Sequence, residues 1–272
     1  MSPLNETEDR PIRPAATIIL LRDINSIDSP AFQAAMIERH KGMAFAGGAT
    51  VFPGGAVDPS DSDKRWPSLC DGLSADRIIA RGQIAAIREA FEEIGILLAR
   101  NHDEQGFVSS EKVTALQEWR SRIEADGAHF IKMVTENNLR LTCDRLVLFA
   151  HWIGPPHISK RYDTLFFAAR APTDQKLIQD GVEATSATWI SPKKALDDLE
   201  QNKRRIIFPT ARNLELLCVK ETIDETLNWA NERKIEPIIP GGEIKDGKLY
   251  LILPDGFGYP ETRFLAKEAV NS

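Results

Sequence analysis

The fold of this chain is decided by one stretch of its sequence, Arg88-Glu89-Ala90-Phe91-Glu92-Glu93-Ile94-Gly95-Ile96. Apolar residues recur around it at spacings of three and four, at Ile84, Ile87, Phe91, Ile94 and Leu98. That spacing predicts an amphipathic helix. The helix should begin after Ser74 as its N-cap or only near Gln83, because Gly82 weakens a continuous helix. The three glutamates then share the opposite face.

Three carboxylates on one helix face repel one another unless positive charge lies among them. Arg88 supplies one such charge, and a divalent cation that prefers oxygen ligands, such as Mg²⁺, would supply the rest. The alternative is an ordinary solvated face, which glutamates at helical spacing usually mark. The upstream run Val51-Phe52-Pro53-Gly54-Gly55 favours the cation, because a Pro-Gly-Gly turn can bring bare backbone and its carbonyls beside the carboxylates.

Gly55 and the stretch from Arg88 to Ile96 together resemble the signature of the Nudix hydrolases. In that signature a glycine is followed by five residues, a glutamate, seven residues and Arg-Glu-apolar-any-Glu-Glu-any-Gly-apolar. The second half agrees at every fixed position. Arg88 follows Gly55 by 33 positions instead of the usual fourteen, so 19 residues are inserted, between Asp58 and Arg81.

The insertion leaves the first glutamate of the signature without an assigned equivalent. Counting back from Arg88 at the usual spacing places it at Ala80, and counting forward from Gly55 places it at Asp61. Both positions stay open at this point.

The resemblance implies an α/β fold, an α/β/α Nudix sandwich with a mixed sheet, here enlarged by the insertion and by added helices. It implies that Mg²⁺ or Mn²⁺ is bound by Glu89, Glu92 and Glu93. The implied catalytic residues are Glu89 as a ligand or the base for the attacking water, Arg88 as the group that orients a glutamate, and Glu93. Expected substrate contacts come from Arg39, Gly54, Gly55 and Arg161. The alternative for Arg88 is a surface ion pair, and for Arg39 a solubilising charge on a strand.

An interrupted signature of this kind is similar to that of the peroxisomal coenzyme A diphosphatases. Three further runs are similar to that group, namely residues 48–55, 161–167 and 189–192, and the resemblance spans about residues 13–217. A related coenzyme A pattern has arginine where this chain has Ala44, and Arg39 offers a similar charge from another position. Nudix enzymes often supply an additional acid near Glu183.

The implied reaction is metal-dependent hydrolysis of a diphosphate bond in coenzyme A or an acyl-coenzyme A. The alternatives are an ADP-ribose or dinucleotide (NADH-type) pyrophosphatase, and a nucleotide-binding Nudix protein without turnover. Expected partners are a small nucleotide-type substrate and, as a possibility, a second copy of the chain in a homodimer.

Length, charge and cysteine usage narrow the class of protein. We expect a single enlarged domain over residues 1–272, with its core at about 13–217 and a C-terminal extension at about 218–272. The net charge of −6 argues against a general nucleic-acid binder. Three cysteines without paired spacing indicate reduced thiols and a cytoplasmic protein. Residues 1–10 lack the apolar core of a signal peptide, and no apolar run is long enough to span a membrane.

The remaining elements follow from local patterns of apolar and turn-forming residues. Strands are predicted at residues 15–21, 35–39, 146–153, 164–169 and 185–190. Helices are predicted at residues 109–125, 192–199 and 211–231. Residues 24–31 and 57–73 read as loops, and residues 235–259 as a hairpin.

Overall fold

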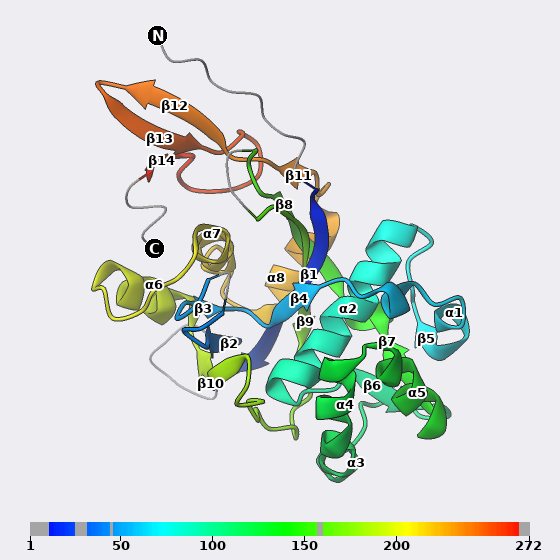
Figure 1. Ribbon diagram of the computed structural model, residues 1–272. Helices are drawn as coiled ribbons and strands as arrows, with labels where there is room; N and C mark the ends of the chain where they lie inside the picture. The colour runs from blue at the N-terminus through cyan, green and yellow to red at the C-terminus, as the bar shows by residue number, and fades with distance from the viewer. Residues whose placement is uncertain (1–10, 25–31, 44–45, 157–159, 267–272) are drawn as a thin grey trace.

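The computed structural model of the protein describes residues 11–24, 32–43, 46–156 and 160–266. Within them an eight-stranded mixed sheet runs through the centre in the order β10-β2-β1-β9-β8-β11, with β3 beside β2 and β4 beside β1 (Figure 1). Its strands are β1 (Arg13–Asp23), β2 (Phe32–Arg39), β3 (Thr50–Val51), β4 (Gly54–Ala56), β8 (Val147–Ile153), β9 (Tyr162–Arg170), β10 (Ala184–Ile190) and β11 (Pro237–Ile238). The central pair, β1 and β9, is parallel, and β2 and β8 flank it in antiparallel fashion.

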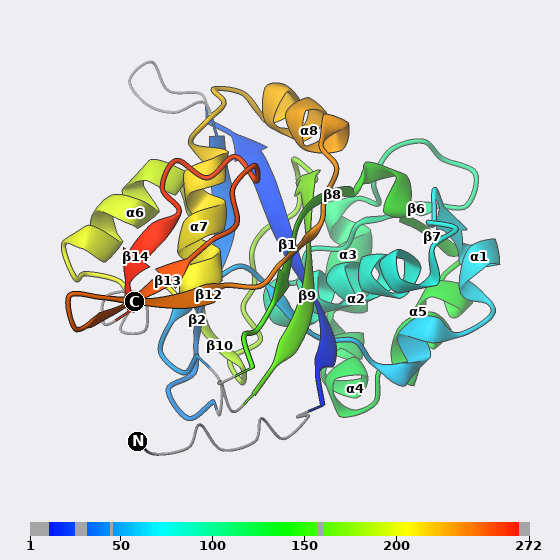
Figure 2. The ribbon, with the colours of Figure 1, turned by 90° about the horizontal axis from the view of Figure 1, so that it is seen from above.

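Helices cover both faces of this sheet, as Figure 2 shows from above. One layer contains α1 (Trp66–Leu69), α2 (Arg77–Ile94), α3 (Ser110–Leu116), α4 (Arg120–Ala125) and α5 (Ala128–Glu136). The other contains α6 (Pro192–Glu200), α7 (Phe208–Leu217) and α8 (Ile223–Glu232). A separate apolar core lies between the sheet and each layer. The alternation of buried side chains along β1 and β9 divides these strands between the two cores. The predicted α/β/α sandwich with a mixed sheet is confirmed.

Helix α2 begins and ends at residues that satisfy its free backbone groups. Asp76 is the N-cap, because its carboxylate accepts hydrogen bonds from the amides of Ile78 and Ile79 at 2.7 and 3.2 Å. Gly95 ends the helix with a φ of 68°. The predicted start near Ser74 is therefore confirmed to within a few residues, with Asp76 and not Ser74 as the N-cap, and the alternative start near Gln83 was wrong. The helix continues through Gly82. A β-carbon there would lie 2.8 Å from Leu165 Cδ1, so the small residue lets the helix lie close to the sheet.

The inserted residues 57–73 fold into regular structure instead of the predicted loop. They contain a 3-10 turn (Pro59–Ser62), α1 and the strand β5 (Cys70–Asp71). This strand joins β6 (Ala99–Asn101) and β7 (Leu139–Thr142) in a second sheet of three strands. The polar residues that suggested a loop instead cap the 3-10 turn. The Asp61 carboxylate accepts a hydrogen bond from the Asp58 amide, and the Asp58 carboxylate accepts one from the Ser60 amide, as in a capping box.

Two other predicted elements differ in continuity. The predicted helix at 211–231 is two helices, α7 and α8, because Thr222 forms a capping box that starts a new one. The predicted helix at 109–125 is α3 and α4 with a 3-10 turn (Gln117–Trp119) between them. The five predicted strands and the helix at 192–199 are present, with ends shifted by a few residues. The predicted loop at 24–31 lies outside the described residues, Ile24 excepted.

The C-terminal part adds a small sheet of its own. The predicted hairpin is present as β12 (Gly241–Lys245) and β13 (Lys248–Ile252), and β14 (Arg263–Leu265) pairs with β13. This sheet projects beside the main one in Figure 1. Of the helices within the described ranges, none has the length and apolar character that crossing a membrane requires.

Trp66 anchors the insertion, and its truncation tests whether the insertion belongs to the folded core. Its ring is 2% exposed, packs on Phe130 at a centroid distance of 5.6 Å, and donates from Nε1 to the Ser60 carbonyl at 2.8 Å. We expect Trp66→Ala to lower the free energy of unfolding by about 3–5 kcal/mol, measured by urea denaturation followed by circular dichroism. Ile244→Ala, at a side chain 77% exposed, should change it by less than about 0.5 kcal/mol. Equal effects would contradict this role.

Candidate active site

A cleft of about 870 Å³ lies beside α2 and is bordered by β4 and the first half of β1. The carboxylates of Glu89, Glu92 and Glu93 line it together with Arg39 and Glu183. The carboxylate face of α2 is thus turned toward a cavity and covered by β4 and the insertion. Glu89 and Glu93 are buried, so this face is not the solvated one of the alternative reading.

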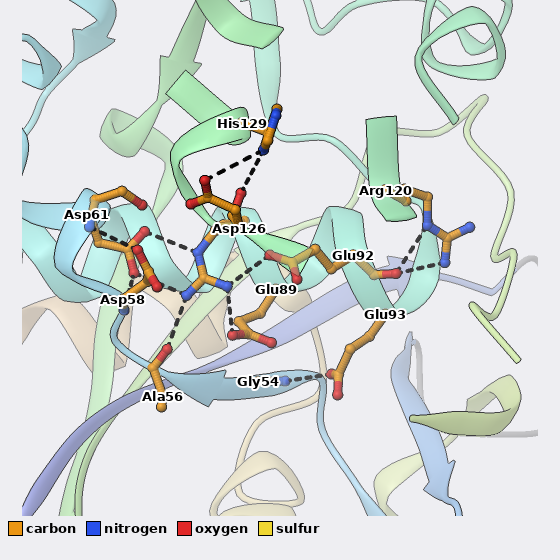
Figure 3. A network of polar contacts seen from close by, with 12 residues as sticks. Gly54, Ala56, Asp58, Asp61, Glu89, Glu92, Glu93, Arg120, Asp126 and His129 are labelled. Atoms are coloured by element: carbon orange, nitrogen blue, oxygen red, sulfur yellow. Dashed lines mark hydrogen bonds and ion pairs between the residues drawn. The ribbon is translucent and has the colours of Figure 1, made fainter. Parts of the chain in front are cut away.

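The guanidinium of Arg88 holds together the carboxylates of Asp61, Glu89 and Glu92, which are labelled in Figure 3. Its Nη1 donates to Glu89 Oε1 at 2.8 Å and to Glu92 Oε1 at 2.7 Å. Its Nε and Nη2 donate to the two oxygens of Asp61 at 3.0 and 2.9 Å, and Nη2 also donates to the Ala56 carbonyl at 3.0 Å. Burial alone would lower the pKa of Arg88, but the surrounding carboxylates raise it above its usual value, so the group stays charged.

Of the two positions that the sequence left open, Asp61 is the one that contacts the glutamate helix through Arg88. It lies six residues after Gly55, where the forward count places the first glutamate of the Nudix signature. Its carboxylate is 2% exposed and forms the two-pronged ion pair with Arg88. The count backward, to Ala80, fails because the insertion separates Asp61 from the helix. The signal for Asp61 was therefore present in the spacing from the glycine.

Glu93 combines deep burial with an incompletely satisfied carboxylate. Its Oε2 accepts a hydrogen bond from the Gly54 amide at 2.8 Å. Its Oε1 is buried without a hydrogen-bond donor, and the nearest cation is Arg39 Nη1 at 3.5 Å. Burial, followed by the charge of Glu89, raises the pKa of Glu93 well above its usual value. The Pro-Gly-Gly turn thus contacts Glu93 of the helix through the amide of Gly54, whereas we expected its carbonyls to lie beside the carboxylates.

Glu89 faces the other glycine of the turn. A β-carbon at Gly55 would lie 2.5 Å from Glu89 Oε1, so a larger residue there would displace this carboxylate from its present position. Burial raises the pKa of Glu89 to about 7, against the lowering effect of Arg88. Burial also raises the pKa of Glu92. Arg120 fixes the helix at this point by donating from Nε and Nη2 to the Glu92 carbonyl at 3.0 and 2.7 Å.

These residues have the chemistry of a site for a hard divalent cation. Several buried carboxylates share one arginine, and Glu93 Oε1 has no donor, so a cation would satisfy an unpartnered oxygen and offset excess negative charge. In the described residues, however, no three histidine, cysteine or acidic side chains are gathered closely enough to hold an ion. Arg88 draws Glu89 and Glu92 together while Glu93 turns to Gly54. Binding would require these side chains to exchange some of their present partners.

A second group of acids lies across the cleft from the Arg88 network. Arg39 joins the two, with Nη1 3.5 Å from Glu93 and Nη2 3.5 Å from Glu183. Glu124 and Asp180 line the same cleft. Burial, then Asp180 and Glu183, raise the pKa of Glu124. Sequence reasoning missed Glu124 and Asp180, because a lone acid in the last turn of a helix or in a loop has no spacing that distinguishes it from surface charge.

Arg161 is the predicted substrate contact that lies apart from the others. Its Nε donates to the Gly154 carbonyl at 3.0 Å, and it is not among the described residues that line the cleft, whereas its neighbours Lys160 and Tyr162 are. Gly54 and Gly55 do line the cleft. The position of Ala44, compared above with the coenzyme A pattern, lies outside the described residues.

The ion pair between Asp61 and Arg88 should contribute measurably to stability. We expect Asp61→Asn to lower the free energy of unfolding by about 3 kcal/mol, because it removes one charge of a buried pair and leaves the other underpaired. Asp63→Asn is the matched control in the same turn, since Asp63 pairs with Arg65, which is mostly exposed; it should cost less than about 1 kcal/mol. Chemical denaturation of both variants measures the difference, and similar losses would argue against a special role for Asp61.

Comparison with known proteins places this geometry in a family. Residues 75–217 match the model described as the NUDT19 Nudix domain. The protein named acyl-coenzyme A diphosphatase NUDT19 is 27% identical in Xenopus laevis, over 87% of this chain and 74% of the relative. Its human counterpart is 25% identical over 86% and 74%. A crystal structure of a Nudix hydrolase from Alicyclobacillus acidocaldarius shares the fold with a TM-score of 0.67 at 22% identity, covering 80% of this chain and 96% of the other. The chain belongs to the Nudix hydrolase family, in the group of the NUDT19 Nudix domain.

Proposed function

We propose that this chain hydrolyses the diphosphate bond of coenzyme A or of an acyl-coenzyme A, with Mg²⁺ or Mn²⁺ as its metal. The observation that carries the proposal is the buried carboxylate face of α2, which borders an open cleft of about 870 Å³. The names of the relatives at 25–27% identity support coenzyme A as the substrate class. The net charge of −6 supports a small-molecule substrate over a nucleic acid.

The lining of the cleft also suits the rest of such a substrate. Beside the acidic residues it includes the aromatic side chains of Phe52, Trp152, Phe166 and Phe208. A coenzyme A thioester has a charged diphosphate and long, less polar arms, so a cleft lined by both acidic and aromatic residues matches both parts. The acidic side alone would repel the diphosphate, which is why the proposal includes a metal ion.

Each residue of the acidic side has a proposed role. A bound divalent ion would neutralise charge on the diphosphate and lower the pKa of a water molecule. Glu92 and Glu93 would hold it, and Glu89 would either join them or take the proton of the attacking water. Its pKa of about 7 suits a base that works at mildly alkaline pH. Arg88 would keep the glutamates in place by charge-assisted hydrogen bonds.

A substrate panel tests this function. With Mg²⁺ or Mn²⁺, the wild type should release adenosine 3′,5′-bisphosphate from coenzyme A and from an acyl-coenzyme A. Chromatography of the products measures this release. Glu93→Gln should lower the rate by at least about a hundredfold, because it removes a charged ligand. Glu243→Gln, at an exposed ion pair with Arg263, should have no effect.

The same panel includes ADP-ribose, NADH and a nucleoside triphosphate. If the protein cleaves only ADP-ribose or NADH, those molecules and not coenzyme A are its substrates. Binding of coenzyme A without turnover, at an affinity that Glu93→Gln leaves unchanged, would identify a nucleotide-binding protein instead of an enzyme.

The buried carboxylates predict a metal-dependent change of stability with pH. The pKa of Glu89 is about 7 in the folded state against 4.5 in the unfolded chain, so the folded state binds more protons in this range. The metal-free protein should therefore lose stability as the pH rises from about 5 to 7. Because a cation binds the charged carboxylates, Mg²⁺ should raise the melting temperature by several degrees more at pH 8 than at pH 5.5. Thermal scans measure this, and an equal Mg²⁺ effect at both values would contradict the assignment.

A further inference from the structure

A second cavity, of about 430 Å³, lies beside the cleft and is lined by basic side chains. Four cations border it, Lys194, Lys203, Arg204 and Arg205, against two acids, Glu38 and Asp198. The cavity is formed where the loop between α6 and α7 approaches β2 and β3, elements that lie together in Figure 1. Its excess of positive charge contrasts with the acidic side of the cleft.

The two cavities lie next to each other, because neighbouring residues of the same two strands line them. On β2, Glu38 lines the basic cavity and Arg39 the cleft; on β3, Thr50 lines the basic cavity and Val51 the cleft. Neighbouring residues on a strand point to opposite sides, which explains the division. Arg205 lines both cavities.

The backbone fixes Arg205 where the two cavities adjoin. Its carbonyl accepts from the Thr50 amide at 2.7 Å, and its Nη1 donates to the Gly47 carbonyl at 3.0 Å. The guanidinium therefore stays beside β3, where a ligand that extends from the cleft into the basic cavity would pass it.

Asp198 organises the basic cavity. Its backbone carbonyl accepts from the amides of Lys203 and Arg204 at 2.8 and 3.2 Å, which folds the loop after α6. Its buried carboxylate pairs with Lys194 and, at 3.1 Å, with Arg204. Across the described part of the chain, no acidic oxygen lies within the 4.0 Å ion-pair distance of Lys203 or Arg205. Two cations in the cavity therefore remain available to a ligand.

We propose that this basic cavity binds a phosphomonoester of the substrate, the 3′-phosphate on the ribose of coenzyme A, while the diphosphate lies in the cleft. The inference rests on the proposed function and goes further, because it names the group that the chain recognises beside the bond it cleaves. A phosphomonoester carries nearly two negative charges at neutral pH and accepts several hydrogen bonds. Lys203 and Arg205 supply charges that no acid among the described residues pairs, and Arg204 adds a charge that Asp198 holds in place.

The test compares two substrates that differ only in this phosphate, coenzyme A and 3′-dephospho-coenzyme A. The wild type, with its metal, should cleave coenzyme A with a kcat/KM at least about tenfold higher. Lys203→Ala should reduce this ratio about tenfold, through a higher KM for coenzyme A, because it removes one charge-assisted contact to the phosphate. Lys193→Ala is the matched control: Lys193 is exposed, pairs with Asp197 at 2.8 Å, and does not line the cavity, so the ratio should not change.

Each other outcome overturns a defined part of the argument. Equal kcat/KM for the two substrates, or an unchanged ratio in Lys203→Ala, would overturn the phosphomonoester site and leave the proposed function intact. An equal drop in both lysine variants would also overturn it, since the effect would then be long-range charge and not contact. If the wild type cleaves neither substrate but does cleave ADP-ribose, the proposed function fails and this inference fails with it.

Discussion

One buried guanidinium, that of Arg88, connects the parts of this structure that form the site. It lies on α2 but bonds to the insertion through Asp61, to β4 through the Ala56 carbonyl, and to two glutamates of its own helix. A buried charge is tolerated only when its partners are complete, so helix, strand and insertion must come together for any of them to be stable. The insertion is therefore part of the active-site framework, although it interrupts the family signature.

The same network leaves negative charge in excess, and this excess is best understood as a functional property. Glu89 and Glu93 are both buried, while Arg88 and the more distant Arg39 are the cations nearest to them. The raised pKa values of these glutamates record the cost of keeping them charged without a further cation. Local conflicts of this kind are expected at functional sites, where the residues that chemistry needs differ from those that would stabilise the fold best.

The sequence predicted those features that repeat at a short, regular spacing. The apolar stripe of α2 and the strands of the central sheet follow from periods near 3.6 and 2, which depend on local geometry alone. The path of the insertion did not follow from the sequence, because its aspartates and serines read as a loop until their capping partners are seen. Glu124 and Asp180 were missed for a related reason, since tertiary folding alone brings them to the cleft.

The paired strands β2 and β3 show how this fold can separate two kinds of charge within a few residues. Glu38 and Thr50 face the basic cavity, while Arg39 and Val51 face the acidic cleft. Because neighbouring residues on a strand point to opposite sides, these two strands separate the cavities without any additional element. A cation in the cleft and an anion in the basic cavity would thus lie on opposite sides of the same strands. A ligand carrying a metal-bound diphosphate and a separate phosphate fits this arrangement better than a ligand carrying the diphosphate alone.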